Sequence, residues 1–207
     1  MPLVRRPGNP PPAATPDAAA VLTALGSPDA DQRWAAARAA SQVPGAAAVL
    51  IHAVWIESQA NVREAMLTSL ARIGSAESVE GLLSLLRSDD ANLRTGALDA
   101  LRSIPGAARD LLPRLLADAD VDVRILCCEL ARSLPGDEAT GQLCDLLARE
   151  QDANVCAAAI DVLTEVGTVA ALPVLAECAE RFRETPFLSF AIEVATDRIR
   201  AETTRRG

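Results

Sequence analysis

One pentad recurs five times along the 207-residue chain and restricts its fold more than any other feature. The last residues of successive copies lie 30, 31, 30 and 32 positions apart, and such a fixed period is typical of a repeat architecture. The chain therefore consists of similar units that stack along one direction. The copies read DADQR (29–33), QANVR (59–63), DANLR (90–94), DVDVR (120–124) and DANVC (152–156).

Each unit predicts two helices. Apolar residues follow the pentad at helical spacing, as Met66, Leu70 and Ile73 do in the second copy, and a further apolar run such as residues 79–86 comes next. Between the two runs stands a glycine, 11 or 12 residues after the pentad, where the end of a helix favours a left-handed residue. The glycines are Gly45, Gly74, Gly106, Gly136 and Gly167.

The polar residues of the pentad predict how the first helix begins. We expect its middle residue to cap the helix, because Asp and Asn side chains accept hydrogen bonds from the free amides there. The closing arginine requires an acidic partner, since a cation in the first turn opposes the helix dipole. Cys156 replaces it in the fifth copy. These structural repeat positions are Asp31, Arg33, Asn61, Arg63, Asn92, Arg94, Asp122, Arg124 and Asn154.

Residues 59–74 and 90–106 resemble the HEAT repeat, in particular the short type named for phycobilisome lyases. The resemblance extends over about residues 18–180 and implies an all-α fold, a right-handed α-α superhelix (solenoid) of about five helical hairpins with capping helices. It also implies that Asp90, Asp120 and Asp152 pair with the repeated arginines, and that the second helices line the concave surface. The expected organisation is a disordered, proline-rich segment (1–14), the solenoid (15–183), and a capping helix with a basic tail (184–207).

Composition excludes several classes of function. The net charge is −8, and such a chain repels nucleic acid. No apolar run approaches the roughly 18 residues of a membrane span, and the prolines around Arg5 and Arg6 disfavour a twin-arginine signal. All 20 basic residues are arginine, which suggests a bacterial genome rich in G and C. We therefore expect a cytoplasmic bacterial protein.

Cysteine and histidine offer little chemistry. The five cysteines contain no C-x-x-C pair, which favours buried thiols in a reducing compartment. Cys156 at a helix start is the alternative, a thiol with a lowered pKa, although no histidine stands near it in sequence. The one histidine, His52, is expected in a core row and cannot supply a metal site by itself. We expect no metal and no cofactor.

Two surfaces are candidates for binding. A polar ridge on the second helices predicts an acidic concave groove suited to a basic peptide or surface. Aromatic side chains gather towards the two ends, where they either seal the stack or anchor a partner; Trp55 is expected in the core. The candidate binding residues are Glu80, Ser84, Asp110, Arg114 and Asp145 on the ridge, and Trp34, Phe187 and Phe190 at the ends.

The sequence thus predicts a non-catalytic protein-protein interaction scaffold or regulatory subunit whose partner is another protein. Self-association is a further possibility, because stacked repeats with incomplete caps expose apolar ends. The alternative is a phycobilin-lyase-like enzyme or enzyme subunit. In that case Arg109 and Arg114 are the residues expected to bind the propionates of a tetrapyrrole.

Overall fold

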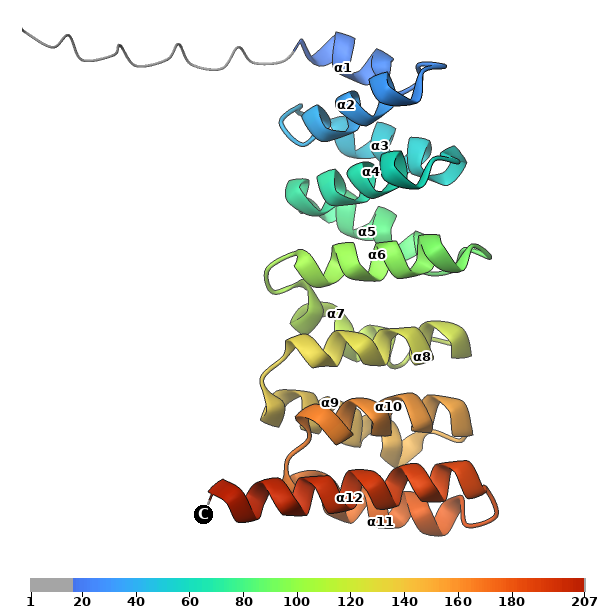
Figure 1. Ribbon diagram of the computed structural model, residues 1–207, viewed down its shortest axis with the longest axis vertical. Helices are drawn as coiled ribbons and strands as arrows, with labels where there is room; N and C mark the ends of the chain where they lie inside the picture. The colour runs from blue at the N-terminus through green and yellow to red at the C-terminus, as the bar shows by residue number, and fades with distance from the viewer. Residues whose placement is uncertain (1–16, 207) are drawn as a thin grey trace, which may run out of the picture.

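The computed structural model describes residues 17–206, and every element within that range is helical. The helices stack in two layers, and the chain alternates between the layers from one end to the other (Figure 1). The predicted all-α solenoid is confirmed. The expected disordered segment 1–14 lies outside the described residues.

One layer holds the helices that contain the end of each pentad, together with the C-terminal helix. Its members are α2 (Ala30–Ala40), α4 (Ala60–Ile73), α6 (Ala91–Ser103), α8 (Val121–Cys128) with its 3-10 continuation η1 (Glu129–Ser133), α10 (Ala153–Val166) and α12 (Pro186–Arg206). The other layer holds α1 (Ala18–Ala24), α3 (Ala46–Ile56), α5 (Ala76–Leu85), α7 (Ala107–Leu115), α9 (Gly136–Arg149), and α11 (Leu172–Arg181) after the 3-10 turn η2 (Val169–Ala171).

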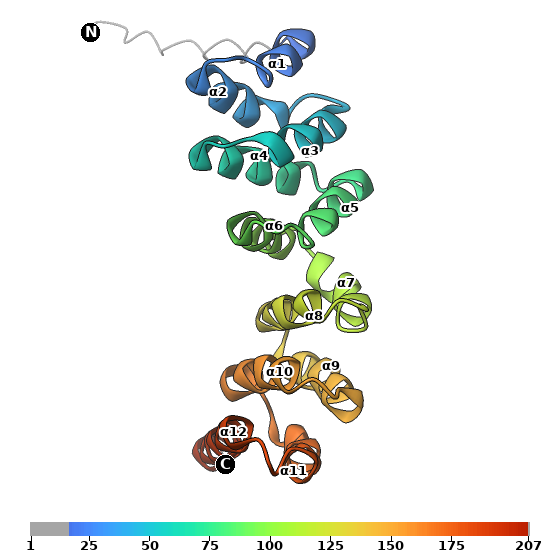
Figure 2. The same cartoon turned by 90° about the vertical axis from the view of Figure 1, so that its right-hand side faces the viewer.

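The stack bends gently, and the bend distinguishes the two layers. In Figure 2 the column from α2 to α12 lies on the inner side and the column from α1 to α11 on the outer side. We call them the inner layer and the outer layer. The resemblance implied that the second helices line the concave surface, but the helices that follow the pentads do so instead.

The hydrophobic core fills the space between the layers. Leucine supplies most of its volume because aromatic residues make up only 2% of the chain. Completely buried leucines come from the two layers alike: Leu70, Leu101 and Leu163 from the inner layer, and Leu82, Leu112 and Leu143 from the outer layer.

The predicted left-handed glycines occur in the first three units only. Gly45, Gly74 and Gly106 have φ angles of 76°, 56° and 79°. Only Gly74 ends the helix before it as predicted, whereas Gly45 and Gly106 stand directly before α3 and α7. Gly136 begins α9 and Gly167 has φ −67°, so the prediction is wrong for these two. Space requires glycine there, because a Cβ would lie 2.8 Å from the Val166 carbonyl oxygen and 2.3 Å from that of Leu163, respectively.

The helix caps lie two residues before the predicted positions. The first residue of the pentad accepts the backbone N–H two positions later, as Asp90 does from Asn92 and Asp152 from Asn154, at 2.9 and 2.8 Å. Asp29 and Asp120 do the same, whereas Gln59 makes no such bond. The predicted caps Asp31, Asn61, Asn92, Asp122 and Asn154 are exposed residues of the first turn.

A second regular row precedes each pentad by two residues, and we call it the acceptor row. Its side chains accept the N–H of the first pentad residue at 2.8 to 3.2 Å. Its main-chain carbonyls accept the arginine that stands six positions later, in each of the first four copies. The repeated arginine thus fastens the loop that leads into its own helix. The row consists of Ser27, Glu57, Ser88, Asp118 and Glu150.

Three of these arginines also reach an acid of the following unit. Arg33 bonds Glu57 at 2.6 Å, Arg63 bonds Asp90 at 2.8 Å and Arg124 bonds Glu150 at 2.8 Å. Of the expected partners only Asp90 serves in this way. The pairs at Glu57 and Glu150 are the more buried, since these residues are 5% and 8% exposed.

These two buried carboxylates remain ionised because of their partners. The Arg33 guanidinium holds the pKa of Glu57 below its ordinary value, although burial opposes this. Burial tends to raise the pKa of Glu150, but hydrogen bonds from Arg124 and from the amides of Asp152 and Gln151 outweigh it and lower that pKa.

Stability is therefore expected to depend on acid pH. In the unfolded chain a glutamate has a pKa of about 4.3, whereas these two glutamates have a lower pKa in the folded protein. As the pH falls below about 4.3, the unfolded chain therefore binds more protons than the folded protein. The free energy of unfolding that the two ion pairs contribute above that pH is lost below it. Urea unfolding should give a constant free energy of unfolding from pH 7 to about 5.5 and a declining one below about 4.5. The double variant E57Q/E150Q should decline less, and a decline parallel to that of the wild type would contradict this assignment.

In the fifth copy Cys156 replaces the repeated arginine, and a different arginine binds the loop carbonyl. The carbonyl six positions before Cys156 is that of Glu150, and it accepts the Arg181 guanidinium of α11 at 3.1 Å. Arg181 also bonds the carbonyl of Leu147 at 2.6 Å. The last full unit therefore keeps the loop contact, although the arginine that makes it comes from the next helix of the outer layer.

The packing between neighbouring helices of the inner layer is loosest between the third and fourth units. The main chains of α6 and α8 approach each other less closely than those of the other neighbouring helices of the inner layer. Arg94 bonds the Ser88 carbonyl at 2.6 Å and reaches no carboxylate within the described residues. Asp118, which occupies the place of Glu57 and Glu150, pairs with the exposed Arg87 instead. No buried ion pair among the described residues joins these two units.

Candidate binding groove

The predicted polar ridge lies on the outer layer. Glu80 and Ser84 belong to α5, Asp110 and Arg114 to α7, and Asp145 to α9, and all five are exposed. Glu80 and Arg114 approach each other at 3.4 Å. Because the outer layer forms the convex side in Figure 2, these residues do not line the concave groove that was expected of them. Arg109 is also engaged, with Glu138 at 2.6 Å.

A groove of about 1150 Å³ lies between α4 and α6 on the inner layer. We call it the α4–α6 groove. Small side chains, Ala71, Gly96 and Ala100, line it together with Leu67. The residue two positions after the pentad is alanine or leucine in the other units, and glycine only at 96. A Cβ at Gly96 would lie 2.6 Å from Leu67 Cδ1, so any larger residue there would crowd the groove.

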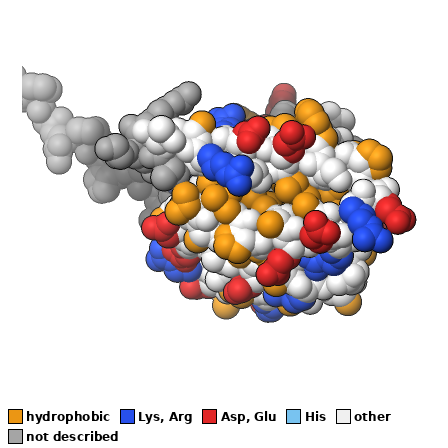
Figure 3. Space-filling model, turned by 90° about the horizontal axis from the view of Figure 1, so that it is seen from below, with side chains coloured by type: hydrophobic (Ala, Val, Ile, Leu, Met, Phe, Trp, Pro, Cys, Tyr) orange, Lys and Arg blue, Asp and Glu red, His pale blue; other side chains and the backbone are white. Residues whose placement is uncertain are grey.

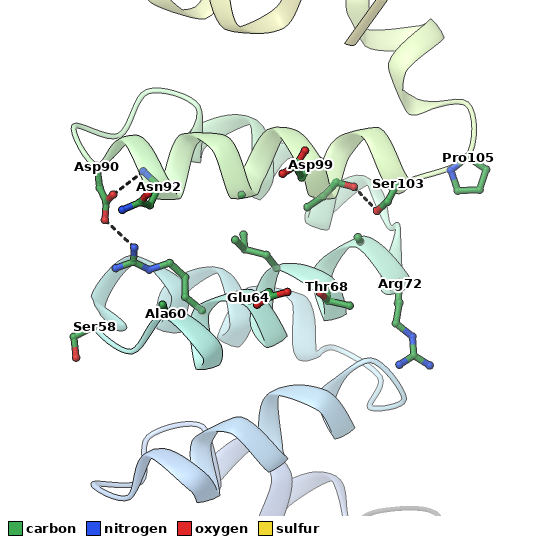
Figure 4. Close-up of a pocket in the computed structure, with 15 residues that line it drawn as sticks. Ser58, Ala60, Glu64, Thr68, Arg72, Asp90, Asn92, Asp99, Ser103 and Pro105 are labelled. Carbon is green, nitrogen blue, oxygen red and sulfur yellow. Dashed lines mark hydrogen bonds and ion pairs between the residues drawn. The ribbon is translucent and has the colours of Figure 1, made fainter. Parts of the chain in front are cut away.

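Polar side chains surround this apolar floor. At one end the Asp90 carboxylate binds Arg63 and the backbone amide of Asn92, and at the other end lie Ser103 and Pro105 (Figure 4). Glu64, Thr68 and Asp99 complete the lining along the two helices. The groove thus combines an apolar floor with hydrogen-bonding groups at its edges, the arrangement typical of binding pockets.

A smaller hollow of about 310 Å³ adjoins the groove, between α2 and α4. Trp34, one of the candidate binding residues, lines it and is 38% exposed. The Arg38 guanidinium lies 4.7 Å from the centre of the Trp34 ring. Glu64, Thr68 and Arg72 line the hollow as well as the groove. The two depressions therefore form one continuous surface over α2, α4 and α6, which we call the α2–α6 surface.

Two residues of α3 that were expected in the core, Trp55 and His52, are exposed. Trp55 is 44% exposed on the outer layer rather than in the core, because α3 buries Leu50 and Val54 and turns the next residue outwards. His52 on the same helix is exposed too, so its predicted core position is wrong.

The C-terminal helix leaves its two phenylalanines exposed. Phe187, Phe190 and Val194 are 52%, 68% and 41% exposed, whereas the buried residues of α12 are Leu188, Ile192, Ala195 and Ile199. Figure 3 looks onto the end formed by α11 and α12 and shows hydrophobic side chains across its middle, with arginine and acidic side chains around them. This end of the stack is not wholly covered by polar groups.

Cys156 does not have the surroundings of a reactive thiol. It is completely buried, and hydrogen bonding with Cys178, together with burial, raises its pKa. Burial also raises the pKa of the half-buried Cys144. A nucleophilic cysteine requires an accessible thiolate.

Residues 17–206 contain neither a metal-binding cluster nor a membrane-spanning helix. No group of three or more His, Cys, Asp or Glu side chains is arranged to hold a metal ion in this range. Among the described helices, none combines the length and the hydropathy that crossing a bilayer requires.

Comparison with known proteins points to helical repeats. No curated protein matches the sequence. An archaeal HEAT-like repeats protein from Thermococcus onnurineus NA1 is 16% identical, with a TM-score of 0.48 over 89% of this chain and 87% of that chain. Computationally designed armadillo repeat proteins for modular peptide recognition give 16% identity and a TM-score of 0.41 over 86% and 98%. Residues 108–185 match the family model of HEAT repeats, so this part of the chain is similar to that family.

Proposed function

We propose that the chain is a non-catalytic scaffold that binds an extended segment of a partner protein along the α2–α6 surface. The observation that carries the proposal is the α4–α6 groove on the inner layer, with the exposed Trp34 beside it. Solenoids use their extended concave surfaces for binding, and exposed tryptophans beside pockets are common anchors at protein interfaces.

The lining of the groove suits a polypeptide. The floor around Leu67 and Gly96 offers an apolar site for a side chain, while Thr68, Asn92 and Ser103 offer donors and acceptors for a main chain. The groove contains hydroxyl groups but no histidine to activate them, since His52 lies on the outer layer.

The period of 30 to 32 residues also favours the short, phycobilisome-lyase-like type of HEAT repeat.

Selection from a phage-displayed library of random dodecapeptides on the immobilised protein tests this function. Recovered peptides should bind the variant W34A at least about tenfold more weakly, because truncating an aromatic anchor removes a large share of the interface energy. G96L, which fills the groove, should also weaken them. Binding is measured by fluorescence anisotropy of labelled synthetic peptides, and thermal unfolding of each variant checks that it remains folded.

A matched control comes from the other tryptophan. W55A removes a ring of similar exposure from the outer layer and should change binding by no more than about twofold. The ridge at Glu80 and Asp110, and Phe187 with Phe190, remain the alternative contact surfaces. Full binding by W34A and G96L, with loss in E80K/D110K or F187A/F190A, would transfer the function to one of those surfaces.

A further inference from the structure

Within helices α1 to α11, two arginines differ from the others in having no oxygen partner. Between residues 17 and 182, Arg38 and Arg72 form neither an ion pair with a carboxylate nor a hydrogen bond to a main-chain carbonyl. Every other arginine in this range does one or both. Arg198 and Arg200 of α12 are exposed and have no such partner among the described residues either, but only Arg38 and Arg72 line one hollow together, in a chain of net charge −8.

Arg38 and Arg72 line the same hollow. Arg38 comes from the last turn of α2 and Arg72 from the last turn of α4. In Figure 4 the Arg72 side chain extends from the end of α4 away from α6, towards the side on which α2 lies. The Trp34 ring supports the Arg38 guanidinium at 4.7 Å, a cation–π contact that leaves the N–H groups of the guanidinium unused.

The helix dipole does not account for the missing partners. Cations are favoured in the last turn of any helix, and Arg102 of α6 and Arg149 of α9 occupy that position too. Both nevertheless bind oxygen: Arg102 binds Asp99 at 2.6 Å, and Arg149 binds the carbonyl of Asp145 at 2.9 Å. The single carboxylate lining the hollow, that of Glu64, leaves an excess of one positive charge there.

We propose that the hollow binds an acidic side chain, Asp or Glu, of the partner segment, and that its carboxylate lies between Arg38 and Arg72. This deepens the proposed function and rests on it, because the α4–α6 groove next to the hollow would receive an apolar side chain of the same segment. Guanidinium groups bind carboxylates through paired N–H donors, which makes the contact specific in geometry as well as charge. The proposed partner motif is therefore acidic, whereas the outer ridge had suggested a basic one.

The test uses labelled synthetic copies of the selected dodecapeptides. Each should contain Asp or Glu at one position of the shared motif. The double variant R38Q/R72Q should bind them at least about tenfold more weakly, because hydrogen bonds to charged groups are lost. A peptide in which Gln replaces that Glu should bind the wild type equally weakly and should lose nothing further in R38Q/R72Q.

The control is R109Q/R114Q, which changes the net charge by the same amount on the exposed surface of α7 in the outer layer. It should bind the acidic peptides within about twofold of the wild type. An equal loss in both double variants would overturn the proposal, because it would show an effect of net charge alone. Binding of a phosphoserine peptide at least tenfold more tightly than its Glu counterpart would also overturn it, in favour of a phosphorylated segment.

The outcomes separate this inference from the function beneath it. Peptides that depend on Trp34 and Gly96 but carry no acid, or carry basic residues instead, would leave the scaffold function standing and remove the acidic motif. Recovery of no peptide by the wild type would overturn both.

Discussion

Replacing Arg124 by alanine is expected to destabilise the protein by about 3–5 kcal/mol. The Arg124 guanidinium binds both carboxylate oxygens of Glu150, at 2.8 and 3.2 Å, as well as the carbonyl of Asp118. The two side chains are 14% and 9% exposed, so the variant would leave a buried carboxylate without its counter-ion. The free energy of unfolding from urea titrations, followed by circular dichroism at 222 nm, measures the loss.

Two companion variants identify the cause. R102A removes an exposed arginine from an i,i+3 pair with Asp99 and should change stability little. R124A/E150Q should be more stable than R124A alone, because a neutral amide is less costly to bury and its oxygen can still accept the amides of Gln151 and Asp152. If R124A were as stable as R102A, the buried pair would not be a major source of stability.

Restoring the repeated arginine at position 156 is expected to be harmful. Cys156 is completely buried, and the Glu150 carbonyl that an arginine there would bind already accepts Arg181. The variant C156R would therefore place a second guanidinium beside the first without an acid to match it. We expect a loss of about 3–5 kcal/mol, the usual cost of an uncompensated buried charge.

The double variant C156R/R181A should recover most of that loss, because removing Arg181 frees the Glu150 carbonyl for the new side chain. C156M separates charge from bulk, since methionine is long but neutral. R181A should not rescue C156M, and equal damage by C156R and C156M would show that volume, rather than competition between two arginines, decides the effect. Urea titrations of the wild type, C156R, R181A and C156R/R181A form a double-mutant cycle for positions 156 and 181.

The fold was largely predictable because the repeat makes it a local problem. The fixed spacing of the pentads and the helical periodicity after them located the helices without knowledge of distant contacts. The repeated arginine also predicted a ladder. Its partners were harder to predict, because Glu57 and Glu150 lie outside the pentad and the spacing from arginine to acid differs among the three pairs, at 24, 27 and 26 residues.

A signal for these acids was nevertheless present. The acceptor row places a serine or an acid two residues before every pentad, and that regularity is as strict as the pentad itself. Its meaning depends on the loop geometry, since the same residue accepts an amide through its side chain and an arginine through its carbonyl. A row of mixed Ser, Glu and Asp does not display that double role in sequence alone.

The site was the less predictable part. Trp34 was among the candidate binding residues, but the groove beside it depends on the single glycine at position 96 and on which layer forms the inside of the bend. Neither follows from helical periodicity, which distinguishes buried from exposed faces and leaves the curvature of the stack undetermined. Periodicity is also undecided for α12, because this helix carries two apolar stripes and only one of them can face its neighbours.

The loosely packed interface between α6 and α8 separates two groups of units that unfold with little cooperativity between them. In a repeat array, cooperativity passes only through nearest-neighbour interfaces, so the weakest interface limits how far a local change in free energy is transmitted. The α2–α6 surface lies entirely in the first group. Occupation of that surface would stabilise the first three units and would leave the opening equilibria of the last units, with Phe187 and Phe190, almost unchanged. The chain would then present two surfaces whose affinities are nearly independent of each other.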